Sequence, residues 1–173
     1  MTSTTSDLVD SSATETGEVD AMALLAADHD DVEEMFIDFQ ELVRNNGSDL
    51  ERGDLVEQIC LALTVHATIE EEIFYPAARD ALGDPGLVEQ AEQEHASAKA
   101  LIEQLQGMDP SEDQYDNLVL QLQEAVDQHV QEEEDEMFPQ LRDSAMDVLA
   151  LGMQMAERRD ELYARLEADS ADR

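Results

Sequence analysis

The 173-residue sequence predicts an all-α fold, an up-down-up-down four-helix bundle with an additional C-terminal helix. Apolar residues recur at intervals of three and four from residue 20 onward, which is the period of an amphipathic helix. Runs of β-branched residues, which are typical of strands, are very few. Turn signals divide the chain into segments of about 20–30 residues, and short connections between helices of that length favour antiparallel neighbours.

The first predicted helix follows residues 1–19, a Ser/Thr-rich acidic stretch with almost nothing to bury, which we expect to be a disordered tail. Its apolar stripe comprises Leu25, His29, Val32, Phe36 and Phe39. The signal Asn45-Asn46-Gly47 is typical of a helix C-terminus and ends this segment. The second stripe comprises Leu55, Ile59, Ala62, His66, Ile69 or Glu70, and Ile73. Pro76 is expected to kink the second helix or to end its regular part.

The third predicted helix begins after the turn Gly83-Asp84-Pro85-Gly86 and ends at Gly107. Its stripe comprises Val88, Ala91, His95, Ala98, Ile102 and Leu105. The fourth helix is expected to start with Ser111 as its N-cap, and its stripe comprises Leu118, Leu122, Ala125 or Val126, His129, Glu133 and Met137. A fifth amphipathic segment, about 146–166, is expected to pack outside the four. The bundle domain is therefore expected to span 20–167, and 168–173 to form a flexible C-terminus.

The chain is strongly acidic, with 44 Asp and Glu against 9 Lys and Arg and a formal net charge of -35. This charge argues against partners such as nucleic acid and anionic membranes, because both are bound through Lys and Arg. The acids are interleaved with apolar residues along the whole chain, as in proteins adapted to high salt. No signal peptide, membrane-length apolar run or disulfide is expected, since Cys60 is the only cysteine. We therefore expect a halophilic, cytoplasmic, soluble protein that is a monomer or small oligomer.

The histidines carry the main functional signal, because the chain has only four and each falls within a different apolar stripe. A single histidine on an apolar face is usually a buried residue bonded to a carbonyl. Here that interpretation has to apply once in every helix, with no histidine left over on the surface. His66 and His129 are each followed four residues later by a glutamate, Glu70 and Glu133. The pattern favours a metal site inside the bundle.

The spacing explains how such a site would form, because residues i and i+4 lie on one face of a helix about 6 Å apart. A carboxylate can also bridge two metals, so Glu70 and Glu133 could supply both bridges. Imidazole and carboxylate ligands suit iron, manganese or zinc, and the absence of thiolates argues against an iron–sulfur cluster. Buried carboxylates without a metal would need each other and a proton.

The sequence resembles the hemerythrin-like family, also called the HHE cation-binding domain, over about residues 20–166. The matching segments are Asp28-His29, His66 to Pro76, Glu94-His95 and His129 to Pro139, in which the pattern HxxxEE…F…P occurs twice. The resemblance implies an oxo- or hydroxo-bridged pair of iron ions (Fe2+/Fe3+) in a four-helix bundle. It implies terminal ligands at His29, His66, His95 and His129, with Glu70 and Glu133 as bridges.

The sequence departs from oxygen-carrying hemerythrins, which have a fifth histidine one helical turn from the third-helix ligand. The flanking positions here are Ala91 and Lys99, so the chain is similar to the four-histidine branch of the family. Two functions remain open. One is a di-iron protein that binds O2 or NO, senses a ligand or handles iron; the other is an enzyme-like role in NO or peroxide detoxification or iron–sulfur centre repair. We favour the non-enzymatic role, and no catalytic residue or redox partner can be identified.

Several further carboxylates have two interpretations. Glu136, seven residues after His129, is either an additional carboxylate directed at the site or an exposed residue near the helix end, and the same ambiguity holds for Glu92 and Glu33. Four others are expected to be solvated: Glu71, Glu72, Glu132 and Glu134. The pocket beside the metals is expected to be apolar and to suit a diatomic ligand. Its expected lining is Leu25, Val32, Phe36, Leu63, Ile69, Ile73, Ala98, Ile102 and Val126.

Overall fold

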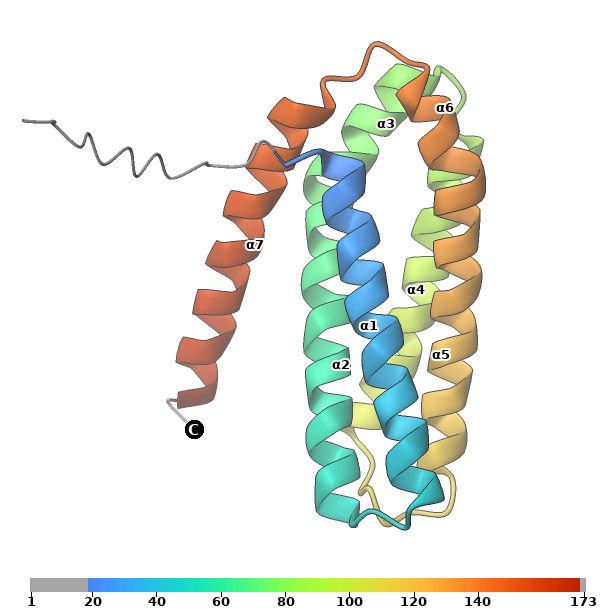
Figure 1. Ribbon diagram of the computed structural model, residues 1–173, viewed down its shortest axis with the longest axis vertical. Helices are drawn as coiled ribbons and strands as arrows, with labels where there is room; N and C mark the ends of the chain where they lie inside the picture. The colour runs from blue at the N-terminus through green and yellow to red at the C-terminus, as the bar shows by residue number, and fades with distance from the viewer. Residues whose placement is uncertain (1–18, 172–173) are drawn as a thin grey trace, which may run out of the picture.

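The computed structural model describes residues 19–171, and its regular elements are all helical within that range. Four long helices lie side by side and alternate in direction (Figure 1). They are α1 (Ala21–Arg44), α2 (Asp49–Ile69), α4 (Gly86–Gln106) and α5 (Tyr115–Glu132). A further helix, α7 (Val148–Ala171), lies outside these four. The predicted bundle with an additional C-terminal helix is confirmed, whereas the predicted disordered tail lies, apart from Val19, outside the described residues.

Helices α2 and α5 each end in a wider turn that leads into a short helix. The π-helical turns are η1 (Glu70–Phe74) and η2 (Glu133–Met137), and the short helices are α3 (Tyr75–Leu82) and α6 (Phe138–Arg142). The amide of Tyr75 donates to the carbonyl of Glu70, five residues back, and Phe138 donates to Glu133 in the same way. A proline follows in both cases and has no N–H to continue the regular pattern. Widened turns of this kind are frequent at functional sites, and both begin at a predicted metal ligand.

Two predicted helix boundaries have different outcomes. Helix α1 ends at Arg44, and Asn46 adopts a left-handed conformation with φ 54°, which confirms the predicted stop. The prediction that Ser111 caps the fourth helix is wrong, because α5 begins at Tyr115. The amide and hydroxyl of Ser111 instead donate to the Asp109 carboxylate at 2.9 and 2.6 Å. This local turn before the helix occupies the groups that a cap would need.

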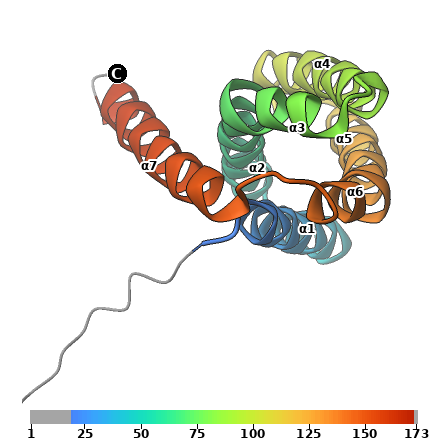
Figure 2. The ribbon, with the colours of Figure 1, turned by 90° about the horizontal axis from the view of Figure 1, so that it is seen from above.

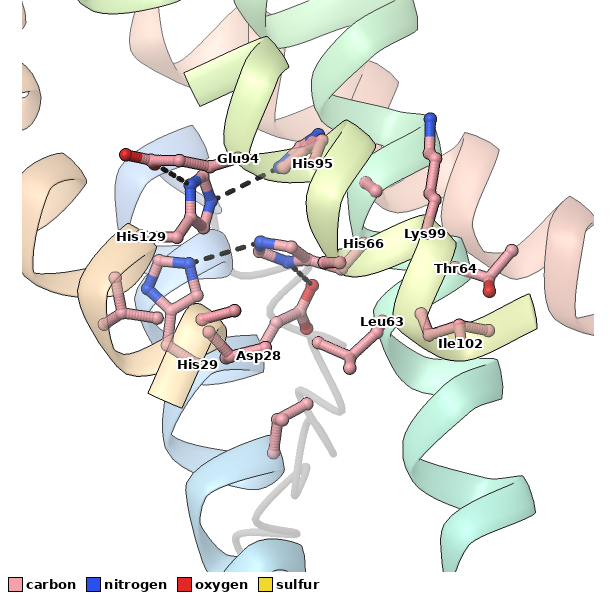
Figure 3. Close-up of a pocket in the computed structure, with 16 residues that line it drawn as sticks. Asp28, His29, Leu63, Thr64, His66, Glu94, His95, Lys99, Ile102 and His129 are labelled. Carbon is pink, nitrogen blue, oxygen red and sulfur yellow. Dashed lines mark hydrogen bonds and ion pairs between the residues drawn. The ribbon is translucent and has the colours of Figure 1, made fainter. Parts of the chain in front are cut away.

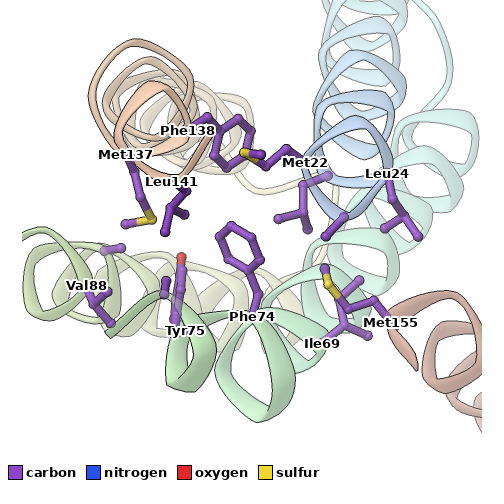
Figure 4. Packing of buried hydrophobic residues seen from close by; sticks show 14 residues of the cluster. Met22, Leu24, Ile69, Phe74, Tyr75, Val88, Met137, Phe138, Leu141 and Met155 are labelled. Atoms are coloured by element: carbon purple, nitrogen blue, oxygen red, sulfur yellow. The ribbon is translucent and has the colours of Figure 1, made fainter. Parts of the chain in front are cut away.

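Two apolar clusters fill the bundle, one on each side of the histidines. The upper cluster, which packs beneath α3, α6 and the start of α7, includes Ile69, Phe74, Tyr75, Phe138 and Met155 (Figure 4). The lower cluster, between the four long helices, includes Phe36, Phe39, Ile59, Cys60 and Leu122. Burial raises the pKa of Cys60 to about 11, so this thiol is a packed apolar group. The histidines therefore lie in a layer that is closed above and below by apolar side chains.

Helix α7 crosses the outside of α1 and α2 and then diverges from the bundle, as both views show (Figures 1 and 2). Its N-terminal part is held closely, because a Cβ added at Gly152 would lie 1.7 Å from the carbonyl oxygen of Val19. Met155 is fully buried beneath it. The helix continues to Ala171, beyond the predicted end near residue 166. None of the described helices combines the length and apolar composition that a membrane span requires.

Candidate metal centre

The six predicted ligands converge in the layer between the two clusters, and all six side chains are buried. Each of five residues offers one ligand atom, and these atoms all lie within 4.8 Å of one another: His29, His66, Glu70, His129 and Glu133. His95 joins them, since its Nε2 lies 3.3 Å from Nε2 of His129. The fold brings distant parts of the chain together here: His29 contacts Glu134, the residue after Glu133, although the two are 105 positions apart in the sequence.

The histidines form two pairs, His29 with His66 and His95 with His129, and in Figure 3 a dashed line joins the two rings of each pair. Nε2 of His29 lies 3.2 Å from Nε2 of His66, and the corresponding distance between His95 and His129 is 3.3 Å. Two ring nitrogens this close cannot both present a proton to each other. When their Nε2 atoms are unprotonated, each pair directs two lone pairs at a common point, which is the arrangement a cation needs.

The two buried glutamates connect the pairs. Glu70 has one carboxylate oxygen 3.2 Å from Nε2 of His66 and the other 3.0 Å from Nε2 of His95. Glu133 has one oxygen 3.5 Å from Nε2 of His29 and the other 3.6 Å from Nε2 of His129. Each carboxylate therefore faces both histidine pairs, which is the position expected of a bridging ligand.

The donor atoms fit a pair of metal ions for a reason independent of the spacing. Glu70 Oε1 and Glu133 Oε2 are buried and accept no hydrogen bond within the described part of the chain. An unpaired buried carboxylate oxygen is costly, so a structure rarely keeps two of them side by side. These are the oxygens that face His66 and His29, where a bound cation would compensate their charge.

The opposite nitrogen of every histidine contacts a carboxylate from another helical segment. The Nδ1 pairs are His29 with Glu134 at 2.9 Å, His66 with Asp28 at 3.2 Å, His95 with Glu71 at 2.9 Å and His129 with Glu94 at 3.0 Å. A proton held on Nδ1 by such a contact leaves the lone pair on Nε2, directed into the centre. The contact also orients the ring and makes it a stronger ligand.

Two of these outer carboxylates correct the sequence analysis. Glu71 and Glu134 were expected to be solvated, but each directly follows a buried glutamate, Glu70 or Glu133, and contacts a histidine. Neighbouring residues on a helix lie about 100° apart, so one can point at the centre while the next points at the adjacent helix. The doubled glutamate in both HxxxEE segments was the available signal.

The other carboxylates with two interpretations lie away from the centre. Glu136 and Glu33 are exposed, which agrees with the helix-surface alternative. Glu92 forms an ion pair with Arg79, at 2.8 Å. Glu72 is exposed and pairs with Arg158, as expected of a solvated residue. None of these four side chains contacts a histidine.

Tyr75 is a site residue that the sequence analysis did not identify. Its hydroxyl donates to Glu133 Oε1 at 2.7 Å and lies 3.2 Å from Nε2 of His95. Burial and the neighbouring carboxylates hold the pKa of Tyr75 well above its usual range, so the phenol keeps its proton. The residue in the equivalent place of the second repeat is Phe138, whose ring stacks on His29 at 6.3 Å. The two histidine pairs therefore have chemically different surroundings.

A small apolar pocket adjoins the histidines on the side of the lower cluster (Figure 3). Its cavity volume is about 40 Å³, close to the space that one small molecule occupies. Five predicted lining residues do line it: Val32, Leu63, Ala98, Ile102 and Val126. The other four pack in the clusters: Leu25, Phe36, Ile69 and Ile73. An apolar space of this size suits a diatomic molecule better than an organic substrate.

Metal binding should release protons, because the metal-free centre holds them on histidine. Burial opposes the charge on His66, but the Glu70 carboxylate and the hydrogen bond to Asp28 outweigh it and raise its pKa to about 10 from an ordinary 6.5. This proton stabilises the metal-free fold fully below about pH 6.5, and the contribution is lost as the pH rises to about 10. The pKa of His29 and that of His95 are also raised.

We therefore expect the metal-free protein to lose stability between pH 7 and pH 10, as measured by chemical denaturation. Metal competes with the same protons, so calorimetry at pH 7 in buffers of different ionisation enthalpy should detect proton release on binding. Equal stability at the two pH values, together with heats that do not depend on the buffer, would contradict this expectation.

The comparisons with known proteins agree with this arrangement. The family model for the hemerythrin HHE cation-binding domain matches residues 20–141. A DNA nickase from Nostoc is 31% identical over 121 residues, which are 70% of this chain and 33% of that protein, so this chain spans about a third of that relative. A crystal structure of an HHE cation-binding domain-containing protein from Mycobacterium kansasii gives a TM-score of 0.71 at 23% identity and covers 85% of this chain and 89% of that one. At this identity the structural likeness shows the fold alone.

Proposed function

This chain belongs to the hemerythrin family of HHE cation-binding domains, and from that premise we propose that it binds two iron ions and a small ligand such as O2 or NO. The proposed ligands are His29 and His66 for one ion, His95 and His129 for the other, and Glu70 and Glu133 as bridges. Iron bound there would supply redox change and affinity for diatomic molecules. Manganese and zinc fit the same donor set, so the identity of the metal belongs to the proposal.

One observation carries this proposal: two buried carboxylates each face both histidine pairs, and each keeps one oxygen without a hydrogen bond. A purely structural role for these residues would leave a layer of buried charge with only histidine protons and the Tyr75 hydroxyl to compensate it. The outer carboxylates support the proposal, because a proton held on Nδ1 leaves Nε2 as the nitrogen that can bind metal once the second ring proton is released.

The apolar pocket supports a small ligand. Its volume of about 40 Å³ is too small for most organic substrates but suits a diatomic molecule. The Tyr75 hydroxyl favours a second candidate, enzyme-like turnover of NO or peroxide, since it places a proton donor beside the His95–His129 pair. We favour binding or sensing over turnover. The nickase activity in the name of the Nostoc relative is not part of this proposal, because a net charge of -35 disfavours contact with DNA.

Metal analysis tests the metal part of the proposal. Protein purified in high salt and loaded with Fe2+ without oxygen should retain two irons per chain after desalting, as the ligand set requires. Retention of a single zinc, or of no metal, would refute the two-iron proposal. The choice between functions then depends on mixing the reduced protein with O2. A stable and reversible charge-transfer band indicates binding, while rapid irreversible oxidation indicates sensing or turnover.

The acidic composition leads to a prediction about salt. We propose that the protein works in a salt-rich cytoplasm, because a compact chain with a net charge of -35 repels itself unless counter-ions screen it. The fold should therefore be lost as salt is removed, and circular dichroism at ~10 mM and at ~2 M salt measures this, because the screening length falls about tenfold between ~0.01 and ~1 M. An unchanged helical signal at ~10 mM salt would contradict the prediction.

A further inference from the structure

Helix α7 reaches the metal centre through one arginine, although it packs outside the bundle. The Arg159 guanidinium donates to Asp28 Oδ1 at 3.1 Å, and the other oxygen of Asp28 lies 3.2 Å from Nδ1 of His66. A continuous path of hydrogen bonds therefore runs from α7 through α1 to a proposed ligand on α2. The adjacent Arg158 takes a different route and donates to Glu72 on η1 at 2.8 and 3.2 Å.

The positions of the few basic residues support a specific role for this path. The chain has only 9 Lys and Arg against 44 acids, yet two of them contact outer carboxylates of the centre. Lys99, the only lysine, contacts Glu71 behind His95, and Arg159 contacts Asp28 behind His66. Each proposed metal position thus has one histidine whose outer carboxylate also binds a cation.

The two basic side chains, Lys99 and Arg159, lie on helices with different places in the fold. Lys99 lies on α4 within the bundle, whereas Arg159 lies on α7, outside the four long helices. In the second repeat the counterpart of Asp28 is Glu94, which contacts His129 and accepts a hydrogen bond from Gln90 on the same helix, at 3.4 Å. Within the described residues, no arginine contacts Glu94. Among the residues that the structure describes, only those of the His29–His66 position are connected in this way to the C-terminal helix.

We propose that Arg159 is a positioning residue for the His29–His66 metal position, so that metal bound there and the docked state of α7 stabilise each other. Arg159 fixes the Asp28 carboxylate, which in turn fixes the ring of His66 and the direction of its Nε2 lone pair. Coupling between two such events is reciprocal: if docking of α7 strengthens metal binding, metal strengthens docking by the same factor. This inference rests on the two-iron proposal above.

The test compares Fe2+ titrations, without oxygen, of full-length wild type and Arg159→Met. Arg159 is partly exposed, so the variant is expected to fold. We expect one of the two iron equivalents to bind about fivefold or more weakly, within the usual range of coupling between sites, and the other to be unchanged. Arg159→Lys should recover part of the affinity, because it restores the charge. In an Asp28→Asn background, Arg159→Met should have no further effect, since the path is already broken.

The matched control is Arg158→Met, which removes the same charge from the same turn of α7 but leaves Asp28 and His66 in contact. It should bind both irons like wild type. Hydrogen exchange gives the reciprocal readout: iron should slow exchange of α7 amides in wild type and in Arg158→Met, but not in Arg159→Met.

Two outcomes would overturn the inference while leaving the two-iron proposal intact. In the first, wild type binds two irons and Arg159→Met binds both of them as tightly as wild type does. In the second, iron does not change the rate of amide hydrogen exchange in α7 of the wild type. A wild-type chain that binds no iron would refute the two-iron proposal itself and the inference with it.

Discussion

Replacing Glu70 with glutamine should reduce iron retained by the protein from two ions per chain to one or none. The carboxylate faces both histidine pairs, so an amide in its place removes a negative charge from both metal positions and directs an N–H₂ group at one of them. Loss of an outer hydrogen-bond partner alone usually costs 10–100-fold in metal affinity, and a bridging ligand should cost at least ~100-fold. Metal analysis after desalting, with titration of Fe2+ without oxygen, measures the effect.

Glu133→Gln should behave like Glu70→Gln, because Glu133 occupies the equivalent place in the second repeat. Glu136→Gln is the control for charge removal, since this exposed side chain lies three residues farther along the same segment and contacts no histidine. It should retain two irons. If Glu70→Gln bound both ions as tightly as wild type, Glu70 would not be a bridging ligand.

Removing the metal should lower the melting temperature by roughly 10 °C. At a free metal concentration of about 1,000 times the Kd, binding stabilises the fold by about 4 kcal/mol. For a domain of this size each kcal/mol shifts the melting temperature by about 2–4 °C. The physical cause is the layer of buried carboxylates, which without metal is compensated by protonated histidines such as His66 and by the Tyr75 hydroxyl. Differential scanning calorimetry before and after chelation, at constant high salt, gives the shift.

The double variant Glu70→Gln/Glu133→Gln separates metal loss from other effects of the chelator. We expect it to retain no metal, because both carboxylates that face the two histidine pairs are replaced, so the chelator should leave its melting temperature unchanged. If wild type with and without metal melted at the same temperature, metal binding would not be coupled to the stability of the fold.

Much of the fold follows from local sequence signals. The period of the apolar residues predicts each long helix, and Asn45-Asn46-Gly47 predicts where α1 ends, because a left-handed residue there is a local backbone preference. Ser111 shows the limit of such reasoning. It is a good capping residue in isolation, but Asp109 competes for its hydrogen bonds, and the helix begins four residues later.

The residues of the candidate site were likewise predicted only in part from the sequence. Histidine placement and the two HxxxE spacings identified the six residues that meet at the centre, because the residues of a ligand set must share the inward face of their own helices. Tyr75 was missed because it lies beyond Ile73, the last residue of the predicted stripe, beside the proline that was expected to end the regular helix. Its hydroxyl acquires a role only when the chain widens into the turn η1 and brings it to Glu133.

By itself, the sequence determined that the chain forms a helical bundle with four histidines and two glutamates directed inward. These properties depend on period and spacing within single helices, which local chemistry controls. Only the tertiary structure decided which histidine stands opposite which carboxylate: His66 with Asp28, His129 with Glu94 and the connection from Arg159 all join different helices. These contacts depend on how each helix is rotated about its axis and shifted along it relative to its neighbours. Both are set by the packing of side chains in the two apolar clusters, not by a local sequence pattern.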